Sequence, residues 1–232
     1  MKINPDSIDT KDKIIVTGFH GIGTTGYWAI KYLIEKLNAK RIAIIDSEQL
    51  APVSICRSGK LLTPCEIYEA NNIIFLRAES FPQNINELSF FRELAEWITT
   101  SGFKELIMIG GLDSTLRTDD TTFRLVTTSK FEAKGILNDA IKLEDDRLIV
   151  GPVALLLNYS EVVDFPASAI LSYASTGRID PRGSANALNV LSKILDLTID
   201  VEPLIKEAEL LELEVAGTKS EIEKSIKDNI YT

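Results

Sequence analysis

The chain has 232 residues and carries 25 basic against 34 acidic side chains, for a formal net charge of −9. This balance argues against a nucleic-acid binder, because phosphate contacts need clustered lysine and arginine, and the sequence has no basic run longer than a pair. The single histidine, His20, excludes a metal site built from several histidines of one chain.

The first half of the chain alternates between short apolar stretches, typical of buried strands, and stretches in which apolar residues recur at helical spacing. Between the first strand and the first helix lies a glycine-rich turn, Gly18–Gly26. A β-hairpin is predicted within Pro52–Tyr68, with its turn at Ser58–Lys60. The predicted strands are Lys13–Thr17, Arg41–Asp46, Val53–Cys56, Ile67–Tyr68 and Asn72–Arg77, and the predicted helices are Tyr27–Leu37 and Glu87–Thr100.

The second half continues this alternation but contains a polar excursion over residues 113–130, with one short strand at Phe123–Val126. Asp180 and Pro181 predict the start of a helix, as its N-cap and its first residue. A last, acidic helix is expected over Pro203–Val215. The other predicted elements are strands at Glu105–Ile109, Arg147–Val150 and Ala167–Ser172, a helix from Pro152 to Tyr159, and the helix from Asp180 to Leu195.

The order of elements predicts an α/β fold. Continuous apolar strands that alternate with amphipathic helices are typical of a mostly parallel sheet covered on both faces, here with an antiparallel hairpin insertion. We expect one domain over residues 1–215 and a flexible C-terminal arm over residues 216–232, because the hydrophobic pattern thins at Ala216. The N-terminus is polar and no apolar run approaches the roughly 20 residues of a membrane span, so a soluble cytoplasmic protein is predicted.

The two cysteines, Cys56 and Cys65, show no metal-binding spacing and are expected to be free thiols. We therefore predict no metal site and, unless the glycine-rich turn holds one, no cofactor.

The glycine-rich turn offers two interpretations. Gly21, Gly23 and Gly26 match the GxGxxG pattern of dinucleotide-binding proteins, and Asp46 follows 20 residues later at the end of a strand. However, three residues separate the first strand from Gly21, and no hydride-transfer acid or base is evident downstream. A structural turn is the favoured interpretation, and a dinucleotide-binding enzyme that uses these four residues is the alternative.

Several segments, taken in order, resemble the archaeal homologues of proteasome assembly chaperone two. The resemblance covers nearly all of residues 13–215, and residues 112–146 depart most from the pattern. The segments that carry it are Gly18–Gly26, Tyr32–Arg41, Ile44–Ser47, Pro52-Val53, Phe103–Glu105, Gly110-Gly111, Val150-Gly151, Leu155–Leu157, Asp180-Pro181, Leu191–Lys193 and Leu197–Asp200.

This resemblance implies a three-layer α/β/α sandwich, similar to purine nucleoside phosphorylases but used without catalysis or cofactor. It further implies a homo-oligomer that binds the α subunits of the proteasome core particle. The protein would act as an assembly chaperone for α rings or as an ATP-independent activator of the finished particle. A phosphorylase-like hydrolase is a third possibility that rests on fold analogy alone.

The last three residues, Ile230, Tyr231 and Thr232, match the hydrophobic–tyrosine–any-residue (HbYX) ending of proteasome activators. The resemblance implies that this tail docks between adjacent α subunits, where the terminal carboxylate meets a lysine. A free carboxylate is a strong acceptor, and tyrosine combines apolar area with one directed hydrogen bond. Several tails on one oligomer would bind together through a high effective concentration. The alternative is a chance ending without a role.

Overall fold

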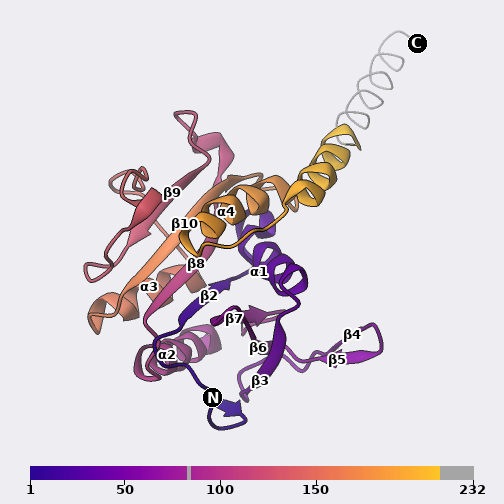
Figure 1. The fold of residues 1–232 in the computed structure, drawn as a ribbon, viewed down its shortest axis with the longest axis vertical. Helices are drawn as coiled ribbons and strands as arrows, with labels where there is room; N and C mark the ends of the chain where they lie inside the picture. The colour runs from indigo at the N-terminus through magenta and orange to yellow at the C-terminus, as the bar shows by residue number, and fades with distance from the viewer. Residues whose placement is uncertain (83–84, 215–232) are drawn as a thin grey trace.

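A single eight-stranded sheet forms the centre of the structure, a computed structural model that describes residues 1–82 and 85–214 (Figure 1). From one edge to the other, its strands are β1 (Lys2–Asn4), β3 (Lys40–Asp46), β6 (Cys65–Ala70), β7 (Ile73–Ala78), β2 (Ile14–Gly18), β8 (Glu105–Asp113), β10 (Ala167–Ala174) and β9 (Phe123–Thr127).

The sheet is mixed. The strands β3, β7, β2, β8 and β10 run in one direction, and β1, β6 and β9 run against them. The predicted mostly parallel sheet is found in the four neighbouring strands β7, β2, β8 and β10, whereas β1, β3, β6 and β9 are joined to their neighbours by antiparallel pairing. β6 reverses because Asn71 and Asn72, at φ 50° and 62°, form a tight turn between β6 and β7. Two successive residues at positive φ are typical of the hairpin turns that match strand twist.

Helices cover both faces of the sheet, as the sequence predicts. The helices α1 (Thr25–Lys36) and α4 (Pro181–Ile194) pack on one face, and α2 (Ile85–Thr100) and α3 (Pro152–Val162) pack on the other (Figure 1). Each face has its own apolar core. Phe91 of α2 and Leu156 of α3 belong to one core, and Ile30 of α1 and Leu188 of α4 belong to the other.

A separate two-stranded antiparallel ribbon, β4 (Ile55–Arg57) and β5 (Lys60–Leu62), stands away from the sheet (Figure 1). The expected second strand of this hairpin, Ile67–Tyr68, is instead part of β6 in the main sheet, so the hairpin is shorter than predicted.

The predicted strand Arg147–Val150 is wrong, because these residues form no strand. The edge of the sheet beside β10 is formed by β9, which pairs with β10 antiparallel. Leu148 and Val150 consequently remain exposed.

The helix α4 is capped at its N-terminus and contacts the last described helix. The Asp180 carboxylate accepts hydrogen bonds from the amides of Gly183 (3.0 Å) and Ser175 (2.8 Å), which confirms the predicted N-cap. Residues 202–214 are helical, in agreement with the expected acidic helix. Arg182 of α4 donates two hydrogen bonds to the Glu212 carboxylate of this helix, at 3.1 and 3.0 Å.

The predicted domain end at residue 215 and the predicted arm over 216–232 lie outside the described residues and stay predictions. Within residues 1–82 and 85–214, no helix combines the length and the apolar character that a membrane crossing requires.

Candidate functional site

Two glycines of the turn after β2, Gly23 and Gly26, face protein rather than open space. A Cβ on Gly26 would lie 2.3 Å from the carbonyl oxygen of Ile109 in β8. Gly23 has a φ of +62°, and a Cβ there would lie 2.7 Å from the Cβ of Ala174 in β10. These two glycines therefore let the turn and α1 approach the sheet, which is a structural role. Gly21 alone has nothing within 4 Å of an added Cβ.

Asp46, the acidic partner in the dinucleotide interpretation, lies far from this turn. It is the last residue of β3 and pairs in register with Lys2 of β1. Two strands, β6 and β7, separate β3 from β2. Neighbouring strands are about 4.8 Å apart, so the two strand axes are about 14 Å apart. The fold does not bring Asp46 to Gly21, Gly23 and Gly26, and it does not favour the dinucleotide alternative.

A substitution pair tests the structural role of the turn. We expect Gly26→Ala to lower the free energy of unfolding by about 3 kcal/mol, because its Cβ would overlap the β8 backbone. Gly21→Ala is the matched control and should change stability by about 0.5 kcal/mol or less, since Gly21 has extended backbone at φ −162° and open space. Urea unfolding followed by circular dichroism measures both. Equal losses would contradict a role in packing.

A cleft of about 300 Å³ opens beside the turn, at the carboxyl ends of β2 and β8. This is where parallel sheets commonly bind ligands. His20 lines the cleft and stacks on Tyr27, with ring centroids 4.0 Å apart. Burial lowers the pKa of His20, against an opposing effect of the Glu79 charge.

The chemistry of this cleft is limited. In the part of the chain that the structure describes, His20 has no hydrogen-bond partner to orient it as a base. Much of the remaining wall is apolar, with Leu143, Ile149 and Leu171 among its residues. The described residues also hold no group of three or more side chains able to bind a metal. The cleft therefore groups no nucleophile with an oriented base.

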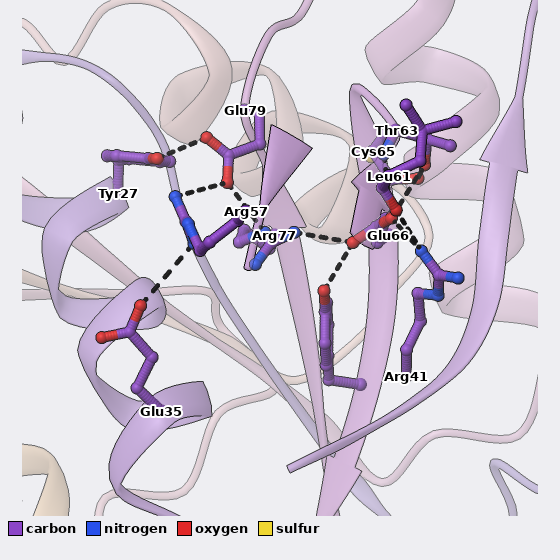
Figure 2. Close-up of polar contacts among 11 residues, drawn as sticks. Tyr27, Glu35, Arg41, Arg57, Leu61, Thr63, Cys65, Glu66, Arg77 and Glu79 are labelled. Atoms are coloured by element: carbon purple, nitrogen blue, oxygen red, sulfur yellow. Dashed lines mark hydrogen bonds and ion pairs between the residues drawn. The ribbon is translucent and has the colours of Figure 1, made fainter. Parts of the chain in front are cut away.

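A chain of alternating acids and bases lies between the sheet and the β4–β5 ribbon (Figure 2). We refer to it as the ion chain. It contains three carboxylates and three guanidinium groups, so its formal charges cancel. Its members, in order of contact, are Arg41, Glu66, Arg77, Glu79, Arg57 and Glu35.

Glu66 of β6 is the centre of the ion chain and is fully buried. One carboxylate oxygen accepts from Arg41 at 2.6 Å and from the amide of Thr63 at 2.9 Å. The other accepts from Arg77 at 2.6 Å and from the hydroxyl of Tyr68. Burial by itself raises the pKa of Glu66, but these hydrogen bonds and the Arg77 charge outweigh it and hold the pKa below its usual value.

The ion chain links the ribbon to the body. Arg77 contacts Glu79 as well as Glu66, with 3.1 Å between its guanidinium Nε and the Glu79 carboxylate. Glu79 also accepts from the hydroxyl of Tyr27 in α1 and lies 3.7 Å from Arg57 of β4. Burial and the bond to Glu79 raise the pKa of Tyr27 to about 12, so its hydroxyl stays a donor. Arg57 reaches Glu35 of α1 at 3.6 Å.

Every carboxylate of the ion chain is paired with an arginine, which leaves none free to act as a general base. Its role is to fix the ribbon against β7 and α1. Our sequence interpretation missed it, although a signal was present. Glu66 and Arg77 are charged residues inside strands that otherwise read as buried, and such residues need partners within the fold.

The structure gives no position for the predicted partner-binding residues. Ile230, Tyr231 and Thr232 lie outside the described residues. The described chain ends with helical residues 202–214, which extend away from the sheet on the α4 side (Figure 1). Leu204 and Ala208 of this helix are buried, whereas Leu210 and Leu213 are exposed.

Comparison with known proteins gives consistent matches over almost the full chain. A family model described as the PAC2 family matches residues 15–218. An uncharacterized protein of Methanocaldococcus jannaschii is 27% identical over 207 residues, which cover 88% of this chain and 84% of that protein.

Two solved structures from Pyrococcus furiosus share the fold. PbaA, described as an archaeal homolog of proteasome-assembly chaperone, is 25% identical with a TM-score of 0.75 over 94% of this chain and 96% of its own. PbaB, described as an archaeal proteasome activator, is 21% identical with a TM-score of 0.74 over 92% of this chain and 96% of its own.

Proposed function

The chain belongs to the PAC2 family, and on that premise we propose that it is a non-enzymatic protein that binds α subunits of the proteasome core particle. The observation that carries the proposal is the similarity to PbaA, which extends over nearly the whole of both chains. The protein acts as an assembly chaperone for α rings or as an ATP-independent activator. The fully paired carboxylates of the ion chain and the unoriented His20 support a role in binding rather than catalysis.

Binding occurs through the tail Ile230–Thr232, with the terminal carboxylate, the Tyr231 ring and hydroxyl, and the Ile230 side chain as the three points of contact. The support for this step is the sequence of the tail and the family of the chain. Several tails on one homo-oligomer raise the affinity, by about 10² to 10⁴ if they engage together. The proposal includes a fold similar to that of purine nucleoside phosphorylases, used here without their catalysis.

A capture experiment tests the partner and separates the two roles. The full chain, immobilised through an N-terminal tag, is offered purified α subunits and, separately, the assembled core particle. Capture of free α subunits together with faster ring formation identifies a chaperone. Capture of the assembled particle together with faster peptide hydrolysis without ATP identifies an activator. If the resin that carries the chain retains neither α subunits nor core particle in larger amounts than a resin without the chain, the proposed function is wrong.

A further inference from the structure

The cleft beside the glycine-rich turn has an uncharged lining. None of the described residues that line it is a lysine, an arginine or an acid, and its volume is about 300 Å³. Ligand pockets usually measure about 300–1,000 Å³ and combine apolar walls with a few polar groups. The cleft therefore has the size and the walls of a site for a small, uncharged compound of one or two rings.

The backbone of β8 is open to the cleft because β8 continues beyond the end of β2. The last residue of β2, Gly18, pairs with Ile109, and β8 runs on through Gly111. Successive residues of a strand within a parallel sheet direct their N–H and C=O alternately to the neighbour on one side and on the other. The amide of Leu106 donates to Pro166, next to β10. The N–H and C=O of Gly111, an odd number of positions later, therefore point to the opposite side, where β2 has ended.

Neither of these two backbone groups of Gly111 has a hydrogen-bond partner within residues 1–82 and 85–214. The acceptor that would continue the ladder is the carbonyl of Phe19, but it accepts from the amide of Tyr27 instead, at 3.2 Å. Gly111 lines the cleft together with His20, whose ring stacks on Tyr27 and has no hydrogen bond to the described chain. Polar groups in apolar surroundings normally have a partner, so these groups are suited to a ligand.

The pattern of these groups favours an amide. A strand residue whose N–H and C=O face an antiparallel neighbour exchanges two hydrogen bonds with the residue opposite. A lactam, which offers an N–H and a C=O side by side, can make the same exchange with Gly111, while the apolar walls cover its ring. Burial lowers the pKa of His20, so the imidazole is neutral at pH 7 and does not favour an anion.

We propose that this cleft is a binding site for a small, uncharged ring compound with an amide edge, which pairs with the backbone of Gly111 and lies beside His20. The inference is independent of the proteasome as a partner. A chain that captures α subunits but fails the test below keeps the proposed function and loses only this binding site.

Titration of the full chain with carbostyril, an uncharged lactam of two fused rings, tests the site. His20 is the only histidine of the chain, so its Cε1 proton gives an imidazole resonance that needs no assignment. Carbostyril is expected to shift this resonance saturably. N-Methylcarbostyril is the matched control ligand, because a methyl group replaces its N–H. It should bind at least tenfold more weakly, since the Gly111 carbonyl then receives no donor.

A pair of variants tests where the compound binds. Ile149 lines the cleft, so Ile149→Trp reduces the space inside it and should weaken carbostyril binding at least tenfold. Leu61→Trp is the matched control, because Leu61 is 61% exposed on the β4–β5 ribbon, and it should bind like the wild type. Circular dichroism checks that both variants are folded. If Ile149→Trp does not fold, the comparison of the two ligands on the wild-type chain decides alone.

Three results would overturn the inference. One is the absence of a saturable shift of the His20 resonance up to the solubility limit of carbostyril. The second is equal affinity for carbostyril and N-methylcarbostyril, which would mean that the cleft accepts apolar rings without pairing to Gly111. The third is undiminished binding of carbostyril by folded Ile149→Trp, which would place the compound outside the cleft.

Discussion

Moving the terminal carboxylate away from Thr232 is expected to reduce the affinity for the core particle at least tenfold. Tyr231→Ala is expected to reduce this affinity at least tenfold as well. A hydrogen bond to a charged group contributes about 1.5–3 kcal/mol, which corresponds to roughly 10- to 150-fold in affinity at one site. The loss is larger if several tails of an oligomer bind together, since each contributes to the effective concentration of the others.

Three variants separate the parts of the tail. Deletion of Ile230–Thr232 removes all three contacts, and one glycine added after Thr232 moves the carboxylate while keeping every side chain. Thr232→Ala is the matched control, because the last position of the HbYX ending accepts any residue, and it should bind like the wild type. Surface plasmon resonance against immobilised core particle gives the dissociation constants. If the deleted chain binds as tightly as the full chain, the tail has no role, even if the core particle remains the partner.

The alternation of strands and helices was predictable because each element buries an apolar face with its own period. For this reason the predicted strands Lys13–Thr17, Glu105–Ile109 and Ala167–Ser172 correspond to β2, β8 and β10 of the parallel centre, with β2 beginning at Ile14. The N-cap at Asp180 was predictable because a cap is a local contact, made here with an amide three residues away. The central strands and the start of α4 thus follow from local patterns.

The order of the strands was not predictable from such patterns, because it depends on contacts between distant residues. Arg147–Val150 has the composition of a strand, but β10 is already paired on its two sides with β8 and β9. The adjacent residues Asn71 and Asn72 are a local signal of the hairpin that turns β6 against β7. The separation of Asp46 from the glycine-rich turn follows from this insertion, so the dinucleotide pattern could be judged only with the sheet order known.

The ion chain was also not predictable from local patterns, because its residues come from separate helices and strands. Glu66 and Arg77 face one another only because β6 and β7 pair in the register that sets residue 66 opposite residue 77. Arg57 joins them from the ribbon, and Tyr27 joins from α1. The sequence marks these residues as charged within apolar strands, but the fold decides which of them meet.

Glu66→Ala is expected to lower the free energy of unfolding by about 3–5 kcal/mol, because it leaves the buried Arg77 guanidinium without its main partner. Arg182→Ala is the matched control. It breaks the Arg182–Glu212 ion pair, which lies at the surface with 3.0 Å between its charged atoms, and should cost about 1 kcal/mol or less. Urea unfolding at neutral pH measures both losses. Similar values for the two variants would contradict the view that burial gives the ion chain its energetic weight.

The pH dependence of stability gives a second test of Glu66. Its pKa is lower in the folded protein than in the unfolded chain, so the unfolded chain takes up its proton first as the pH falls. The stabilisation by Glu66 is therefore present in full above its unfolded pKa of about 4.5 and declines as the pH falls through the folded value. Glu66→Gln keeps the shape of the side chain but cannot titrate, so its free energy of unfolding should fall less steeply than that of the wild type below about pH 4.5. Parallel curves for the two proteins between pH 5 and pH 3 (about two units around that value) would mean that Glu66 is not held ionised by its hydrogen bonds from Tyr68, Thr63 and Arg41 and by the Arg77 charge.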